Sequence, residues 1–216
     1  MIEFYDLIKS IHPDTFSKYI VYAEKGLKNL YCFPKREYHN WEHVTNCLEE
    51  LENTDIPGLD EYRNIIALSI FYHDCIYYPM GSDNEKLSAE RASIDLMGLG
   101  FHESYAKTIH DHILLTNSKK PCDFLSGQVL MDIDMSILGK SIAVFKCYEY
   151  QIRLEYHFVL TATYKKERVK FLNSLLKKNR IYQTKYFQDK YEDIARDNIK
   201  NLVDELGPIK IKKLDF

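Results

Sequence analysis

The longest apolar stretch of the chain, residues 65–72, ends in two ionisable residues, His73 and Asp74. Residues 60–77 are apolar almost all round, which is typical of a helix buried inside a bundle. A carboxylate and an imidazole that leave water must be paired, hydrogen-bonded or bound to a metal. Residues 38–43 upstream and 132–134 downstream supply further histidines and carboxylates. Together these segments offer enough ligands to surround one divalent cation.

Helical periodicity dominates the remainder of the chain, and strand signals are weak. Apolar residues at i, i+3, i+4 and i+7 predict an amphipathic helix over residues 40–52. Ser82 and Glu85 have the spacing of a capping box, which predicts the start of a helix that ends at Gly98 or Gly100. We expect a loop over residues 117–128. Further helices are predicted over residues 102–116, from Gly139 to about 160, over about 162–179 and over about 187–206, the last stopped by Gly207 and Pro208. The sequence thus predicts an all-α fold, a single-domain helical bundle over residues 1–216.

Composition argues against several classes of function. Hydrophobic residues make up 45% and charged residues 28% of the 216 positions, which are ordinary values for a globular domain. The formal net charge of −3 gives no general reason to bind nucleic acid or an anionic membrane. No apolar run approaches the roughly 18 residues that cross a bilayer, and the first residues lack the layout of a signal peptide. The five cysteines are scattered and odd in number, which favours reduced thiols and a cytoplasmic location. We expect no membrane or nucleic-acid partner and leave the oligomeric state open.

Helical spacing constrains the candidate ligands. His39 and His43 are four residues apart and share a helix face, with His43 closer to the apolar stripe. His73 and Asp74 lie about 100° apart on a helix, so both reach one ion only near their shared edge. Asp132 and Asp134 point to nearly opposite sides of a helix. We therefore expect one of these two to bind the ion and the other to lie in its surroundings or in solvent.

Two other groups have competing explanations. In the segment His110-Asp111-His112, the spacing predicts His112 as a hydrogen-bonded histidine at the core edge and His110 nearer solvent, although either can line a pocket. The basic segment 165–180 can contact a nucleic acid, or it is simply a solvated helix face that includes Arg168.

The joint pattern of His43, the His73-Asp74 pair and Asp134 resembles the signature of the HD superfamily of metal-dependent phosphohydrolases. The chain also resembles a narrower group of predicted HD hydrolases over nearly its whole length. Residues 38–43 are in addition similar to a segment of the cyclic nucleotide phosphodiesterases. The matching segments are residues 36–43, 71–74, 83–85 with 88–89, 132–139, 150–156 and 195–198.

The resemblance implies a bundle of the HD-domain type and one divalent metal ion held by His43, His73, Asp74 and Asp134. Mixed nitrogen and oxygen ligands suit Mn, Co, Ni, Fe, Mg or Zn and do not separate them. By similarity to the phosphodiesterases, His39 is the candidate general acid that protonates the leaving oxygen. Asp74 is also expected to orient a metal-activated water. The chain departs from relatives that carry a further histidine after the residue matching Thr116, since Asn117, Ser118, Lys119 and Lys120 follow it here, and this favours one metal ion over two.

Two residues are candidates for assisting roles. Arg36 offers the fork geometry that clamps a phosphate oxygen, or it is a surface arginine at a helix start. Glu85 can orient the water or a ligand, or it serves only its capping box. The sequence therefore predicts a phosphomonoesterase or phosphodiesterase that acts on a nucleotide or another small phosphorylated metabolite. The alternatives are a non-catalytic sensor that binds metal or nucleotide and an HD-fold non-haem iron oxygenase, which would normally need a second iron.

Overall fold

The computed structural model describes residues 2–117 and 121–207. Within these ranges it contains ten α-helices, two short 3-10 helices and no strand, which confirms the predicted all-α helical bundle. The helices are α1 (Phe4–Ile11), α2 (Ser17–Cys32), α3 (Trp41–Glu52), η1 (Asp60–Tyr62), α4 (Arg63–Tyr72), α5 (Asn84–Gly98), α6 (Glu103–Leu115), α7 (Leu125–Asp134), η2 (Met135–Gly139), α8 (Ile142–Glu155), α9 (Thr161–Leu176) and α10 (Lys185–Leu206). None of the described helices is long and apolar enough to cross a membrane.

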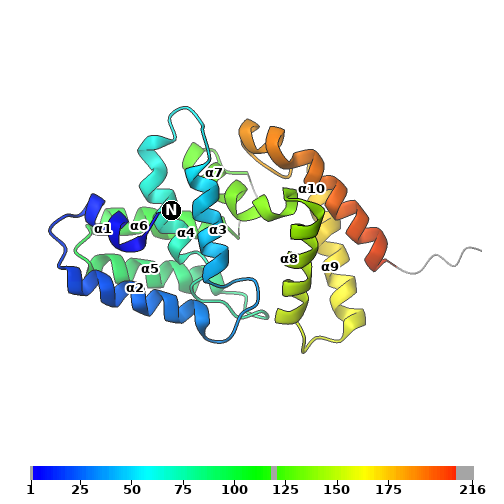
Figure 1. Cartoon of the computed structure of the whole chain (residues 1–216), viewed down its shortest axis with the longest axis horizontal. Helices are drawn as coiled ribbons and strands as arrows, with labels where there is room; N and C mark the ends of the chain where they lie inside the picture. Colours follow the sequence, from blue (N-terminus) through cyan, green and yellow to red (C-terminus); the bar gives the residue numbers. More distant parts are fainter. Residues whose placement is uncertain (1, 118–120, 208–216) are drawn as a thin grey trace, which may run out of the picture.

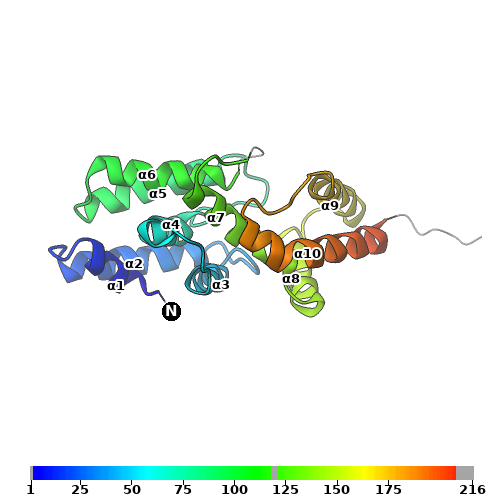
Figure 2. The same cartoon turned by 90° about the horizontal axis from the view of Figure 1, so that it is seen from above.

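Helix α4 is the centre of the larger part of the molecule. It packs against α1, α3, α5, α6 and α7, and Figure 2 shows it between a layer of α1, α2 and α3 and a layer of α5 and α6. Every residue from Ile66 to Tyr72 is buried, as the all-round apolar pattern predicts. The helix is shorter than the predicted 60–77 because the chain turns at His73, where the Cys75 N–H donates to the Tyr72 carbonyl at 3.0 Å. This turn places the two ionisable residues at the buried end of the central helix.

Helices α8, α9 and α10 form a second group at one end of the molecule (Figure 1). The short helix η2 connects the two groups and packs against α7, α8 and α10. A buried carboxylate, Glu50 on α3, also links them, because it accepts hydrogen bonds from Lys140 at 2.5 Å, Lys190 at 2.6 Å and the Tyr191 hydroxyl at 2.8 Å. The junction between the groups is therefore built from charged and aromatic side chains.

Several predicted helix boundaries were wrong. No helix was predicted before residue 40, where the structure has α1 and α2, and the predicted loop 117–128 covers the start of α7. Helix α8 ends at Glu155 and not near 160. The stop of α10 at Gly207 agrees with the prediction, whereas Pro208 and residues 118–120 lie outside the described residues.

The predicted capping box at Ser82 does not form. Helix α5 begins at Asn84 and its N-cap is Asp83, whose side chain bonds to no N–H of the helix and accepts from the Ser82 hydroxyl at 3.2 Å. Instead the Asn84 side chain accepts from the Tyr78 N–H at 3.0 Å and donates to the Tyr78 carbonyl at 2.9 Å. The turn before α5 is thus held by the side-chain amide of the first residue of the helix.

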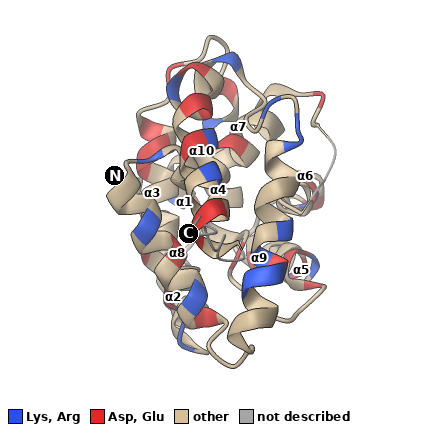
Figure 3. Ribbon diagram, turned by 90° about the vertical axis from the view of Figure 1, so that its right-hand side faces the viewer, with Lys and Arg blue, Asp and Glu red and all other residues tan. Residues whose placement is uncertain are grey.

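The basic segment was predicted as a solvated face, and Arg168 departs from it. Its guanidinium is only 11% exposed and contacts Glu149 and the Tyr148 hydroxyl of α8. Figure 3 shows Lys and Arg interspersed with Asp and Glu over the end formed by α8, α9 and α10. Arg168 was misassigned because helical spacing alone does not reveal that α8 lies against this part of α9.

Candidate metal centre

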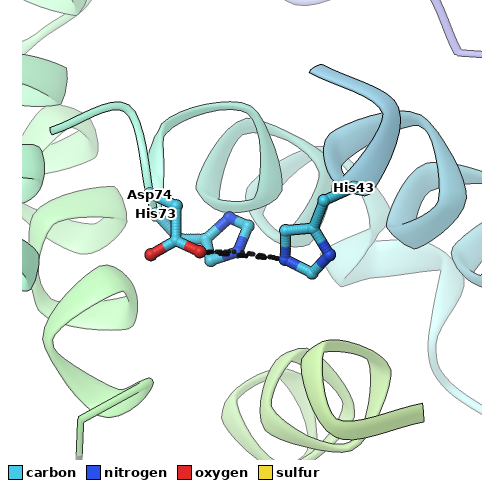
Figure 4. Close-up of side chains that lie close together, drawn as sticks. All are labelled: His43, His73 and Asp74. Atoms are coloured by element: carbon cyan, nitrogen blue, oxygen red, sulfur yellow. Dashed lines mark hydrogen bonds and ion pairs between the residues drawn. The ribbon is translucent and has the colours of Figure 1, made fainter. Parts of the chain in front are cut away.

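The structure brings together the four residues that the resemblance implies as ligands. His43 Nε2 lies 3.0 Å from His73 Nε2 and 3.3 Å from Asp134 Oδ1. His73 Nε2 lies 3.3 Å from Asp74 Oδ2 and 3.5 Å from Asp134 Oδ1. Figure 4 shows His73 and Asp74, at the end of α4, facing His43 on α3. Three helices thus deliver two imidazoles and two carboxylates to one point.

Local backbone interactions aim the two imidazoles. Asn40 is the N-cap of α3, and its side-chain oxygen accepts from the N–H groups of Glu42 at 2.8 Å and His43 at 3.4 Å, which fixes where the helix begins. His73 Nδ1 lies 2.8 Å from the Ile70 carbonyl. Because a carbonyl only accepts, Nδ1 carries a proton and Nε2 faces the cluster, where it offers a lone pair to an ion whenever it is not itself protonated. This arrangement is typical of histidines that bind metals.

The charges of the cluster require a positive partner. Burial disfavours the charged form of His73, yet the Asp74 charge and the contacts with both carboxylates outweigh it and hold the His73 pKa well above its usual range. Burial likewise opposes ionisation of Asp74 and Asp134, but the adjacent imidazoles dominate and lower the pKa of both carboxyl groups. Two ionised carboxylates beside imidazole lone pairs are stable only with bound protons or a cation. A divalent ion can replace those protons.

The spacing and exposure of the four groups also fit an ion. Neighbouring ligands of a cation with bonds of about 2.1 Å lie roughly 3 Å apart when the bonds are at right angles. Four of the separations, at 3.0–3.5 Å, are near that value, whereas His43 Nε2 and Asp74 Oδ2 lie farther apart at 3.8 Å. The imidazoles are only 4% and 2% exposed, whereas Asp134 is 26% exposed. The centre is therefore accessible from the side of its carboxylates.

A third histidine, His39, lies beside the cluster and is paired with Glu155. His39 Nδ1 is 2.7 Å from Glu155 Oε2, and the ring centroids of His39 and His43 are 6.0 Å apart. Glu155 Oε1 also accepts from three consecutive backbone N–H groups, those of Glu37 at 3.1 Å, Tyr38 at 2.8 Å and His39 at 2.9 Å. Burial opposes the charge on Glu155, but the His39 contact and these N–H groups outweigh it and lower its pKa. A carboxylate next to Nδ1 leaves His39 Nε2 as the nitrogen available for proton transfer.

Arg36 has a structural role instead of the predicted phosphate clamp. One terminal nitrogen donates to the carbonyls of Asp74 at 2.5 Å and His39 at 3.2 Å. The other donates to the carbonyls of Cys75 at 2.9 Å and Leu30 at 2.7 Å. These four bonds use all the terminal N–H groups of the guanidinium, and the residue is only 7% exposed. Arg36 therefore ties the turn after α4 to the segment before α3, and we do not retain it as a substrate-binding residue.

The two remaining candidates, Asp132 and Glu85, form hydrogen bonds with residues outside the cluster. Asp132 is buried, and its carboxylate accepts from the N–H groups of Gln183 at 2.7 Å and Thr184 at 2.8 Å and from the Thr184 hydroxyl at 2.8 Å. It is thus neither solvated nor bonded to a ligand, and it holds the start of α10. Glu85 accepts from Asn117 at 3.0 Å. Its role in orienting a water stays a prediction.

The two histidines of the His110-Asp111-His112 segment form hydrogen bonds with residues outside the cluster. His112 is buried, its Nδ1 donates to the Thr108 carbonyl at 2.7 Å, and its Nε2 lies 2.9 Å from the Ser126 hydroxyl. Burial lowers the pKa of His112. His110 is 28% exposed and contacts Asp111. This matches the prediction of a hydrogen-bonded core histidine with a more exposed neighbour.

Sequence reasoning missed a cavity and a thiol at the centre. A cavity of about 220 Å³ is lined by Tyr38, His43, Cys47, Asp134 and Lys140, among others. Cys47 Sγ lies 3.7 Å from His43 Nδ1, one helical turn along α3. Burial raises the pKa of the Cys47 thiol. The apolar stripe of residues 40–52 contains Cys47, so its sequence context favours a packing role and conceals its closeness to the ligands.

Comparison with known proteins adds no relative. No protein-family model matches the chain, and searches of curated proteins and of solved structures find no match. A function can therefore be proposed only from the residues of this chain.

Proposed function

We propose that this protein is a metal-dependent phosphoric ester hydrolase with one divalent ion held by His43, His73, Asp74 and Asp134. The observation that carries the proposal is the set of short distances among these four side chains beside the His39–Glu155 pair. The ligand cluster alone would suit a metal sensor. A histidine held by a buried carboxylate at its edge has a use in proton transfer, which favours catalysis. The resemblance to the HD superfamily agrees with this assignment.

The chain's own residues supply most of the proposed chemistry. When bound, the ion would lower the pKa of a water and polarise the phosphoryl group. The Asp74 side chain is 14% exposed, more than the two imidazoles, and its second oxygen can orient the attacking water. His39, held through Nδ1 by Glu155 and stacked on Tyr77 at 4.0 Å between ring centroids, presents Nε2 to the leaving oxygen. Arg36 acts indirectly, because it fixes the backbone of both segments.

The cavity beside the centre is lined by His43 and Asp134 but not by His39 or Asp74, so it bounds the substrate only on the side of those two ligands. At about 220 Å³ it is below the roughly 300–1,000 Å³ of drug-sized ligand pockets. Its wall combines apolar side chains with polar ones such as Asn46 and Lys140. We therefore propose a small phosphorylated metabolite, or one end of a nucleotide, as the substrate.

The test is phosphate-ester hydrolysis by metal-stripped protein that is resupplied with Mn²⁺, Co²⁺, Ni²⁺, Fe²⁺, Mg²⁺ or Zn²⁺. The substrates are a nucleotide panel and generic mono- and diesters. Asp74→Ala should abolish both ion binding and turnover. Asp111→Ala is the matched control, since Asp111 also follows a histidine but is 52% exposed and outside the cluster. Ion binding without turnover on any ester would contradict the hydrolase and favour a sensor, and oxygen consumption with Fe²⁺ would favour the oxygenase.

A further inference from the structure

Cys47 lies beside two of the four proposed ligands, His43 and Asp134. Its Sγ is 3.7 Å from His43 Nδ1 and 3.9 Å from His43 Nε2, and the residue is only 3% exposed. Positions i and i+4 of a helix lie above one another on the same face, so α3 presents the imidazole and the thiol together. The thiol also lines the cavity beside the centre. It therefore combines burial in the core with access to the metal centre.

The donor atoms form a second group that shares one histidine with the first. His43, Cys47 and Asp134 each offer a ligand atom within 4.8 Å of the others, as do His43, His73 and Asp74. Zinc binds thiolate sulfur at about 2.3 Å and imidazole nitrogen at about 2.0–2.1 Å, so neighbouring sulfur and nitrogen ligands lie roughly 3.6 Å apart. Cys47 Sγ lies 3.9 Å from His43 Nε2, the nitrogen that faces the cluster, which is slightly longer than that value.

We infer that Cys47 is a sulfur ligand of this centre and gives it a preference for thiophilic divalent ions, such as zinc or cadmium, over magnesium. Thiolate ligands select such ions, whereas the carboxylate and imidazole ligands of the centre accept a wider range of ions. On binding, the thiol releases its proton to solvent and the sulfur donates a lone pair to the ion. The inference depends on the metal centre of the proposed function, but its test does not require turnover.

The experiment uses the full chain with the exposed Cys32 and Cys147 replaced by serine, which removes surface thiols as competing cobalt ligands. Metal-stripped protein is titrated with Co²⁺ under anaerobic conditions. Visible ligand-field bands report occupancy of the centre, and a near-ultraviolet charge-transfer band reports a cobalt–thiolate bond. We expect both to saturate together at one equivalent.

Cys47→Ser should remove the charge-transfer band, retain the ligand-field bands and weaken Zn²⁺ and Cd²⁺ binding by about tenfold or more while leaving the Mg²⁺ affinity unchanged. Cys122→Ser is the matched control, because Cys122 is also buried but its sulfur lies near the Phe124 carbonyl. It should preserve every band. If Cys47→Ser does not fold, the parent protein still decides, because its own spectrum shows or lacks the thiolate band.

The outcomes separate the two proposals. Saturating ligand-field bands without a charge-transfer band would overturn the role of Cys47 and leave the hydrolase proposal standing. A charge-transfer band that persists in Cys47→Ser would also overturn it. If no Co²⁺ binds at all, the sulfur ligand is refuted, and the ester assay with the other ions then decides the hydrolase proposal.

Discussion

The interaction of Glu155 with His39 and the preceding backbone predicts a measurable loss of stability for Glu155→Gln. Glu155 Oε1 accepts three backbone N–H groups at 2.8–3.1 Å. Hydrogen bonds to charged groups contribute about 1.5–3 kcal/mol and neutral ones about 0.5–1.5, so neutralising the acceptor costs about 1 kcal/mol per bond. Three bonds amount to about 3 kcal/mol. For a chain of this size the midpoint of thermal unfolding should fall by about 6–12 °C.

The same substitution should also change the chemistry of His39. The glutamine amide would face His39 Nδ1, 2.7 Å from the present carboxylate oxygen, and donate a hydrogen bond to it. The imidazolium form, which needs a proton on Nδ1, would then be opposed. We expect hydrolysis of esters with poor leaving groups to slow by about 10²–10³, since such groups need a proton donor. Esters with good leaving groups should slow by less than about tenfold.

Urea unfolding and steady-state hydrolysis of the two ester classes are the assays. Glu167→Gln, which neutralises a 58% exposed carboxylate on α9, is the control and should stay within about 0.5 kcal/mol of the parent. A Glu155→Gln protein that loses less than about 1 kcal/mol would refute the stabilising role of the carboxylate. Equal slowing on both ester classes would refute its role in proton transfer.

Three other perturbations have expected outcomes. Gly139→Ala should destabilise the protein by about 1–3 kcal/mol in urea, because its Cβ would lie 2.8 Å from Tyr191 ring carbons, whereas Gly98→Ala, with open space around it, should be neutral or slightly stabilising. Asp132→Asn should cost about 1–3 kcal/mol, because one of its acceptors becomes an amide NH₂ facing an N–H, yet calorimetry should show unchanged metal affinity. Burial opposes the charge on Glu50, but its hydrogen bonds with Lys140, Lys190 and Tyr191 outweigh burial and lower its pKa from 4.5. In acid the unfolded chain therefore binds more protons than the folded one. As the pH decreases from about 4.5, the melting temperature should decrease, and it should decrease less in Glu50→Gln.

The sequence was sufficient to predict the features that depend on local spacing. The stripe of residues 40–52 and the all-apolar run before His73 became α3 and the buried α4. The two helices were predicted correctly because burial of a helix face is encoded within a few turns of the chain. The shared helix face of His39 and His43 was predicted wrongly, because α3 begins at Trp41 and His39 lies before it.

Side-chain partners remote in sequence could not be predicted. Glu155 is 116 positions from His39. In a single sequence its carboxylate is indistinguishable from the solvated face of an amphipathic helix. Helical spacing could not decide which of Asp132 and Asp134 faces the ion for the same reason. The Asp132 carboxylate accepts hydrogen bonds from the N–H groups of residues 183 and 184, which are about 50 positions away in the sequence. Arg36 was misjudged because the carbonyls that it binds belong to three different segments.

A metal ion at the proposed centre would couple its binding to the assembly of the two groups of helices. Asp134 is the last residue of α7, and η2 follows it directly and packs against both α8 and α10. An ion shared by Asp134, His43 and His73 would fix the end of α7 against α3 and α4, while the Glu155 carboxylate fixes α8 against the segment before α3. Without the ion, the ionised Asp74 and Asp134 repel each other at this junction unless the imidazoles carry protons. Ion binding should therefore stabilise the folded chain by mass action, and most strongly at the connection between α7 and α8.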